Sequence, residues 1–256
     1  MNFSKVLTCV KIGYHYHMNP SYLDPQNYLQ YLDSPQGQIQ QKMLAEAIIA
    51  KLPNAPQDIL DLGCGSGWLA GALTKLNFKV TAVDSSEALI KLARSHYPNI
   101  EFTLADATNL PFPHQQFDLC VANMVMHDID DLPSAFINIS NTLKTKGLLL
   151  ATIPNPYLAF PVGVWKRGLR KLFGGVPKLK LLEKVYFQKR HQSHEWRPSL
   201  KSYFYTLSDY LQASHPNFII TDLIDIESKE DSNSFNLYHQ LHRFPVIWMI
   251  MFKKLL

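Results

Sequence analysis

The stretch Asp61-Leu-Gly63-Cys-Gly65-Ser-Gly67 separates an apolar segment, residues 58–62, from a helical one, residues 68–76, and it decides the fold of the chain. Glycines in such a turn let the backbone bend tightly and let a ligand approach without a Cβ in the way. The helix that follows presents free N–H groups at its start. The spacing G-x-G-x-G departs from the G-x-G-x-x-G pyrophosphate fingerprint, and no Gly-Lys-Ser/Thr of a P-loop is present. The turn therefore indicates a ligand-binding loop of another kind, with a purely structural turn as the alternative.

Strand and helix patterns alternate on both sides of this turn, from about residue 57 to 154. Such alternation is typical of a parallel sheet with crossover helices. The predicted strands are 58–62, 78–83, 100–104, 117–122, 146–153, 217–226 and 244–252. The predicted helices are 37–51, 68–76, 87–95, 132–143 and 199–213.

Polar residues follow the next three predicted strands in order. Asp84 closes the second strand, where a carboxylate can accept hydrogen bonds from both hydroxyls of a ribose. Asp106 and Ala107 follow the third strand, where a carboxylate can accept from the amine of an adenine. Asn123 and Met124 end the fourth. Because the carboxyl ends of parallel strands share one edge of the sheet, we expect these residues to line one nucleoside-binding site.

Together these residues resemble the class I S-adenosylmethionine (SAM)-dependent methyltransferases, specifically the methyltransferase type 11 group that includes ubiquinone/menaquinone-biosynthesis enzymes. The resemblance is specific over residues 57–154. It is carried by Asp61–Gly67, Val83–Asp84, Asp106-Ala-Thr-Asn-Leu-Pro-Phe112, Phe117-Asp118 through His127-Asp128, and Leu143-Lys-Thr-Lys-Gly147. One departure is Lys144-Thr-Lys-Gly147, where the family often has a proline-glycine turn.

The resemblance implies an α/β fold with a Rossmann-like, seven-stranded, mostly parallel sheet. The last strand would be antiparallel, helices would cover both faces, and an N-terminal helical arm and a basic lid insertion would be added. It implies SAM as cofactor, S-adenosylhomocysteine as product, and no metal. By the same resemblance, the glycine turn would hold the methionine part of SAM, Asp84 the ribose, and Asp106 with Ala107 the adenine. The cofactor-binding residues expected are Asp61, Gly63, Cys64, Gly65, Gly67, Asp84, Ser85, Asp106, Ala107, Asn123 and Met124.

The catalytic residue predicted is His127, just past the fourth strand, acting as a general base near neutral pH. A merely structural histidine is the alternative, since alignment and desolvation of a nucleophile can suffice for transfer of a sulfonium methyl group. The pairs His191/His194 and His239/His242 have ligand-like spacing but no supporting Cys or Glu pattern, so no metal site is predicted.

The bulk composition, 46% hydrophobic and 18% charged over 256 residues, fits a single globular domain. We divide it into an N-terminal arm and helix (1–52), a cofactor-binding core (57–154), a lid insertion (155–198) and a C-terminal helix with the last two strands (199–256). No apolar run approaches the roughly 18 residues of a membrane span. Three cysteines (Cys9, Cys64 and Cys120) cannot all pair, which favours a reducing cytoplasm.

Charge is unevenly distributed along the chain. Residues 155–198 hold ten Lys/Arg and two Glu, a local charge of +8, whereas the whole chain is +4, so the remainder is −4. The segment is expected to be a lid over the substrate pocket. A lid that binds anions, or that contacts a membrane peripherally through Trp165, Leu169, Leu172 and Phe173, is the alternative.

The acceptor predicted is an oxygen, nitrogen or carbon nucleophile of a small molecule, with an anionic or lipid-like acceptor left open. A membrane-associated quinone or lipid methyltransferase and a nucleic-acid (RNA) methyltransferase using residues 155–198 are the alternatives. Asn155-Pro-Tyr157 is similar to the Asn-Pro-Pro-Tyr signature of base amino-methyltransferases, but it follows the fifth strand instead of the fourth. This position counts against nucleic acid. A non-catalytic SAM-binding protein is disfavoured because Asp84 and Asp106 occur together.

Overall fold

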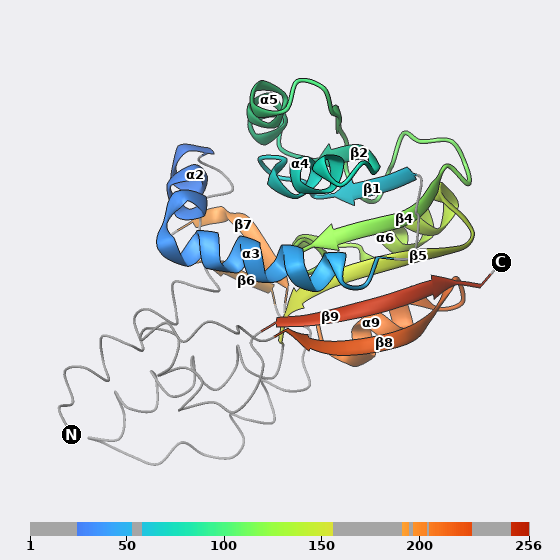
Figure 1. The fold of residues 1–256 in the computed structure, drawn as a ribbon. Helices are drawn as coiled ribbons and strands as arrows, with labels where there is room; N and C mark the ends of the chain where they lie inside the picture. The colour runs from blue at the N-terminus through green and yellow to red at the C-terminus, as the bar shows by residue number, and fades with distance from the viewer. Residues whose placement is uncertain are drawn as a thin grey trace, which may run out of the picture.

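The computed structural model describes residues 25–52, 58–155, 191–194, 197–203, 205–226 and 247–255. Its centre is a seven-stranded sheet in the order β3-β2-β1-β4-β5-β9-β8 (Figure 1). The strands are β1 Asp58–Leu62, β2 Lys79–Asp84, β3 Glu101–Leu104, β4 Phe117–Asn123, β5 Leu143–Pro154, β8 Phe218–Ile226 and β9 Ile247–Lys254. A separate two-stranded sheet pairs β6 His191–His194 with β7 Arg197–Tyr203. The helices are α2 Pro25–Asp33, α3 Pro35–Ile49, α4 Trp68–Lys75, α5 Glu87–His96, the 3-10 turn η2 Met126–Asp128, α6 Leu132–Thr142 and α9 Leu207–Ser214.

The strands β1 to β5 pair with one another in parallel, and β9 is antiparallel to both β5 and β8. This confirms the predicted sheet with its antiparallel last strand. Within the sheet, the chain runs from β1 outward to β2 and β3, then returns to β4 on the other side of β1. The strand order therefore reverses between β1 and β4. In open α/β sheets, ligands bind outside the carboxyl ends of the strands at such a reversal.

Successive residues of each buried strand point to opposite faces of the sheet. In β4, Cys120 and Ala122 join one apolar cluster, whereas Leu119 and Val121 join the other. The first cluster includes Phe136 of α6, together with residues of α9. The second includes residues of α3, α4 and α5. Helices thus cover both faces, as predicted, and a central strand such as β4 is a nearly continuous apolar run because neither of its faces meets water.

The N-terminal helical region is longer than expected. A single helix was predicted over residues 37–51, whereas the structure has α2 and α3, separated at Ser34. The Ser34 hydroxyl accepts from the Gly37 amide, and Pro35 occupies the first turn of α3. Serine caps and a first-turn proline are standard signals for a helix start. The two helices approach so closely at Gly37 that a Cβ there would lie 2.0 Å from the Tyr31 carbonyl oxygen.

The helix predicted over residues 199–213 is wrong in its first half. Residues up to Tyr203 form β7, and the helix α9 begins only at Leu207. A capping box fixes this start: the Thr206 hydroxyl accepts from the Asp209 amide, and the Asp209 carboxylate accepts from the Thr206 amide. Upstream, pairing with β6 satisfies the backbone of β7 in extended form. Short-range propensity for helix is overridden by this pairing.

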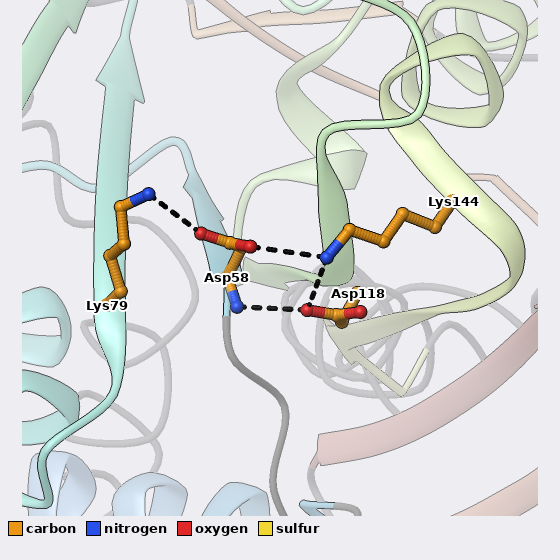
Figure 2. A network of polar contacts seen from close by, with 4 residues as sticks. All are labelled: Asp58, Lys79, Asp118 and Lys144. Carbon is orange, nitrogen blue, oxygen red and sulfur yellow. Dashed lines mark hydrogen bonds and ion pairs between the residues drawn. The ribbon is translucent and has the colours of Figure 1, made fainter.

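A charged network lies at the amino ends of the central strands β1, β2, β4 and β5 (Figure 2). The Lys144 ammonium lies 3.2 Å from the Asp58 carboxylate and 2.9 Å from that of Asp118. Asp118 also accepts from the Asp58 amide at 3.0 Å, and Lys79 lies 3.0 Å from Asp58. Residues 144–147, which depart from the family pattern, thus supply a side chain that links β1, β4 and β5.

Candidate active site

A cleft of about 660 Å³ lies at the carboxyl ends of β1 to β4, at the reversal of strand order. Its volume is typical of a site for a cofactor or small molecule. The lining after β1 and β2 includes Gly63, Gly65, Asp84, Ser85 and Ser86; after β3 and β4 it includes Ala105 to Thr108, Asn123 to Val125 and Asp128 to Asp131. The cleft therefore joins most of the residues that the sequence singles out.

The glycine turn is held open by its backbone conformation. Gly63, Gly65 and Gly67 have φ angles of 69°, 56° and 81°, in the left-handed region that favours glycine. A Cβ on Gly63 would lie 2.4 Å from Val125 Cγ2, which forms the facing wall. The amides of Gly63 and Cys64 both donate to the Val83 carbonyl, at 2.7 and 2.9 Å. The turn is thereby fixed to the end of β2, next to Asp84.

Asp84 bridges the glycine turn and the start of α5. One carboxylate oxygen accepts from the Gly65 amide at 2.9 Å, and the other accepts from the Ser86 amide at 2.8 Å. Burial raises the pKa of this carboxyl above its usual value, while these amides act in the opposite direction. Each oxygen can accept a further hydrogen bond. Asp84 is therefore a rigidly placed acceptor pair at the cleft wall, and Ser86, not Asp84, caps α5.

Asp106 is exposed and forms a local turn at the end of β3. One of its oxygens accepts from the Thr108 amide at 2.8 Å and from the Thr108 hydroxyl at 2.6 Å. The loop is tied to α6, because Asn138 donates to the Thr108 carbonyl at 2.7 Å. Asp106 and Ala107 line the cleft together.

Asn123 and Met124 turn the chain at the end of β4. Met124 has a φ of 56°, unusual for a residue with a side chain, and its amide donates to Thr152. The Thr152 hydroxyl donates to the Asn123 side-chain oxygen at 2.7 Å. Strained backbone at a cleft is a common feature of ligand-binding sites. The buried Thr152 of β5 is the neighbour that stabilises this conformation.

Asp61, Cys64 and Gly67 lie outside the lining of the cleft. Asp61 is only 1% exposed, beneath the glycine turn, and its Oδ2 atom has no hydrogen-bond partner among the described residues. Burial raises the pKa of Asp61 to about 7, with a further contribution from the charge of Asp84. Cys64 and Cys120 are buried free thiols, and burial raises the pKa of each. These residues are buried in and next to the turn and do not line the cavity.

His127 also lies outside the lining, in η2. Its Nε2 atom is 3.6 Å from a carboxylate oxygen of Asp128, which does line the cleft. Its buried Nδ1 atom has no partner among the described residues. The ring thus lies next to a residue of the cleft wall.

Some lining residues were not expected from the sequence. Tyr31, Gln40, Gln41 and Leu44 of α2 and α3 form part of the wall. Tyr31 donates to the Gln40 side chain, and burial raises the pKa of Tyr31 to about 12. The aromatic character of the N-terminal arm was the available signal, but a helix-to-cleft contact is not encoded in local spacing.

The charge of the lining is entirely negative. Asp84, Asp106, Asp128, Asp130 and Asp131 line the cleft, and no Lys, Arg or His does so among the described residues. Such a site attracts a cation. In the part of the chain that the structure describes, no group of three or more His, Cys, Asp or Glu is arranged to hold a metal ion. His239 and His242 lie outside the described residues, as does most of the predicted lid.

No helix among the described residues is long and apolar enough to cross a membrane.

Comparison with known proteins identifies this core. A family model described as "Methyltransferase domain" matches residues 60–151. A malonyl-[acyl-carrier protein] O-methyltransferase of Hahella chejuensis is 34% identical over 118 residues, 44% of this chain and 42% of that protein. An uncharacterised Bacillus subtilis methyltransferase, YodH, is 28% identical over 164 residues, 62% of this chain and 64% of its own length. The chain thus spans less than two thirds of the length of these relatives.

Solved structures share the fold at low sequence identity. A SAM-dependent methyltransferase from Mesorhizobium loti superposes with a TM-score of 0.64 at 19% identity, covering 84% of this chain and 99% of that one. The [4+2]-cyclase SpnF superposes with a TM-score of 0.59 at 16% identity, covering 88% of this chain and 85% of its own. The fold alone therefore does not specify the reaction. The family match is to this part of the chain: residues 60–151 match the type 11 group of the class I SAM-dependent methyltransferases.

Proposed function

We propose that this protein transfers the methyl group of SAM to an oxygen, nitrogen or carbon nucleophile of a small-molecule acceptor. The observation that carries the proposal is the carboxylate of Asp84, fixed between the Gly65 and Ser86 amides at the wall of a cleft of about 660 Å³. Both oxygens keep acceptor capacity there, which suits two vicinal hydroxyls.

The described residues fit the cofactor. Gly63 and Gly65 would lie against the methionine part of the cofactor. The space between the turn and Val125 is narrow, since a Cβ on Gly63 would collide with the Val125 side chain. Asp84 and Ser85 would hold the ribose, and Asp106 with Ala107 the adenine. Asn123 and Met124 would lie at the turn facing these groups. The negative lining suits a cofactor that carries a sulfonium and an ammonium group.

Bound SAM supplies an electrophilic methyl group, whose transfer leaves a neutral thioether. The chain would contribute alignment and exclusion of water, which can account for much of the acceleration of such a transfer. His127 is the proposed general base, and its contact with Asp128 at the cleft wall supports this role. The acceptor proton would pass to His127 when the nucleophile carries one.

The charge of the described lining bears on the acceptor. Carboxylates of Asp128, Asp130 and Asp131 would repel an anionic group, so a neutral or cationic acceptor is favoured at this wall. An anionic or lipid-like acceptor was left open because of basic residues that lie largely at 156–190, outside the described residues. RNA is a weaker candidate for the same electrostatic reason.

Calorimetry with SAM and with S-adenosylhomocysteine tests the cofactor. Asp84→Ala should weaken SAM binding by about 1–3 kcal/mol, because two hydroxyls lose a charged acceptor. Asp222→Ala, which removes an exposed carboxylate from β8, is the matched control and should leave affinity unchanged. Equal affinity of wild type and Asp84→Ala would remove Asp84 from the site. A labelled-methyl transfer assay across metabolite, lipid and RNA pools then identifies the acceptor class and separates methyl transfer from cofactor binding alone.

A further inference from the structure

Three buried tyrosines, Tyr203, Tyr205 and Tyr210, converge on the loop that forms one wall of the cleft. We define them as the tyrosine clamp and residues 126–131 as the cleft loop. The three side chains are 4%, 4% and 1% exposed. Tyr203 ends β7, and Tyr210 lies in α9, so the clamp belongs to the C-terminal part of the chain. The cleft loop follows β4, more than seventy residues earlier.

The rings form one packed unit. Tyr203 and Tyr205 stack at 5.6 Å between centroids with an interplanar angle of 22°. Tyr205 and Tyr210 meet edge to face at 5.8 Å and 68°. Such pairs add stability beyond the area that they bury. The stack restricts the positions of the hydroxyl groups.

The hydroxyls of this unit meet consecutive residues of the cleft loop. The Tyr205 Oη atom lies 2.8 Å from the carbonyl oxygens of both Ile129 and Asp130. Tyr203 makes a side-chain hydrogen bond to the Asp130 carboxylate. The Tyr205 O–H has a single proton, so it is shared between two carbonyls or alternates between them. Phenylalanine would fill the same space as Tyr205 but would leave these carbonyls without their donor.

The loop that receives these contacts faces the cavity. Asp128, Ile129, Asp130 and Asp131 all line the cleft, and β7 packs against η2. Asp131 is also fixed as the N-cap of α6, where its carboxylate accepts from the Ser134 amide. Ile129 and Asp130 lie between η2 and this cap, and the clamp contacts both of them.

We propose that Tyr205, supported by Tyr203 and Tyr210, is a positioning residue that sets the cleft loop for ligand binding and methyl transfer. This inference rests on the proposed function. Tyr205 acts through the carbonyls of Ile129 and Asp130 and does not itself line the cavity.

The test compares Tyr205→Phe with wild type by hydrogen exchange of backbone amides and by calorimetry with S-adenosylhomocysteine. Measurements are made well below the melting temperature of each protein. We expect peptides covering residues 126–132 to exchange about tenfold faster in the variant, with peptides from β1, β2 and β4 unchanged. We expect the affinity for S-adenosylhomocysteine to fall about three- to tenfold.

Tyr97→Phe is the matched control, because Tyr97 is a half-buried tyrosine at the end of α5 that packs against Gly71 of α4. It should change neither readout. If Tyr205→Phe does not fold, Tyr203→Phe provides the same test through the contact with Asp130.

Unchanged loop exchange, exchange that rises equally throughout the sheet, or faster loop exchange with unchanged affinity would each overturn the positioning role. A wild-type protein that does not bind S-adenosylhomocysteine would instead refute the proposed function, and the positioning role would fall with it. Failure of the positioning role and failure of the proposed function are distinguishable. The former is seen only by comparing Tyr205→Phe with wild type, whereas the latter is seen in wild type alone.

Discussion

Asp61 and Asp84 stand at the ends of neighbouring strands, yet their surroundings differ. Burial is the largest cause of a raised pKa at both carboxyls. Asp84 receives amide hydrogen bonds on both oxygens, whereas one oxygen of Asp61 has no partner among the described residues. The sequence predicted a cofactor role for both. In the structure only Asp84 lines the cleft, whereas Asp61 is buried within the domain.

Asp61 should make stability depend on pH. Its pKa of about 7 exceeds the usual value near 4, so the folded state retains a proton that the unfolded state releases. The stability that this group contributes is therefore fully present below about pH 4 and is lost as pH rises to about 7. Asp61→Asn should be more stable than wild type at pH 8 by more than about 1 kcal/mol, since each unit of pKa shift corresponds to about 1.4 kcal/mol.

Urea unfolding of cofactor-free wild type and Asp61→Asn between pH 4 and 8 measures this difference. The advantage of the variant should disappear near pH 4. Asp222→Asn, at an exposed position of β8, serves as the control. Parallel stability curves for Asp61→Asn and wild type would show that Asp61 is ionised normally.

His127 gives a kinetic prediction. If it removes the acceptor proton, His127→Ala should lower turnover about 10²-fold while the affinity for SAM stays within about twofold of wild type. The measurement is turnover with the acceptor found by the transfer assay, together with calorimetry. A loss confined to SAM affinity would make His127 a residue that supports the cofactor wall through Asp128.

At the scale of elements, most boundaries were readable from local signals. The strands from 58 to 154 are apolar runs that end in polar turns, and Ser86 and Asp131 cap the helices that follow. The error over residues 199–213 arose where pairing between β6 and β7 decides the conformation. The signal for the true start of α9 was present as Thr206-Leu-Ser-Asp209, a capping box. Non-local pairing has no comparable signature in a single sequence.

The network at the amino ends of the strands makes a prediction about Lys144. Its ammonium group lies between two carboxylates on different strands, and its side chain is 38% exposed (Figure 2). Because the group is partly solvated, Lys144→Met should destabilise the protein by only about 0.5–1.5 kcal/mol near neutral pH. Urea unfolding measures this, with the exposed Lys91→Met in α5 as control.

The effect of Lys144→Met should also depend on pH. The hydrogen bond from Lys79 is the largest cause that lowers the pKa of Asp58 below its usual value, and Lys144 lowers it further. The resulting stability is present above about pH 4 and is lost as pH falls through the lower pKa of the folded state. The gap between wild type and variant should therefore narrow in acid. A constant gap down to pH 3 would argue that Lys144 acts through packing of its aliphatic stem.

At the scale of the whole molecule, the sequence predicted the sheet and the edge at which the cleft lies, because both follow from ordered local motifs. It did not predict the wall formed by α2 and α3, nor the tyrosine clamp. These depend on segments far apart in sequence. The charge of the cleft was also not predicted. The basic residues are the most prominent charged group in the sequence, but the described lining of the cleft is acidic. Net charge does not reveal the local potential of a site.

That acidic lining predicts a difference between cofactor and product. SAM carries a net charge of about +1 near neutral pH through its sulfonium, whereas S-adenosylhomocysteine is close to neutral. Five carboxylates line the cleft without a described cation among them, so they should favour SAM electrostatically. Salt screens such attraction, since the Debye length falls from about 10 Å at 0.1 M to about 3 Å at 1 M. Raising the NaCl concentration from 0.05 to 1 M should therefore weaken SAM binding several-fold and S-adenosylhomocysteine binding less than twofold. Calorimetry at each salt concentration measures both affinities. Identical salt dependence for the two ligands would mean that other charges compensate the carboxylates, and that the cleft does not discriminate cofactor from product by charge.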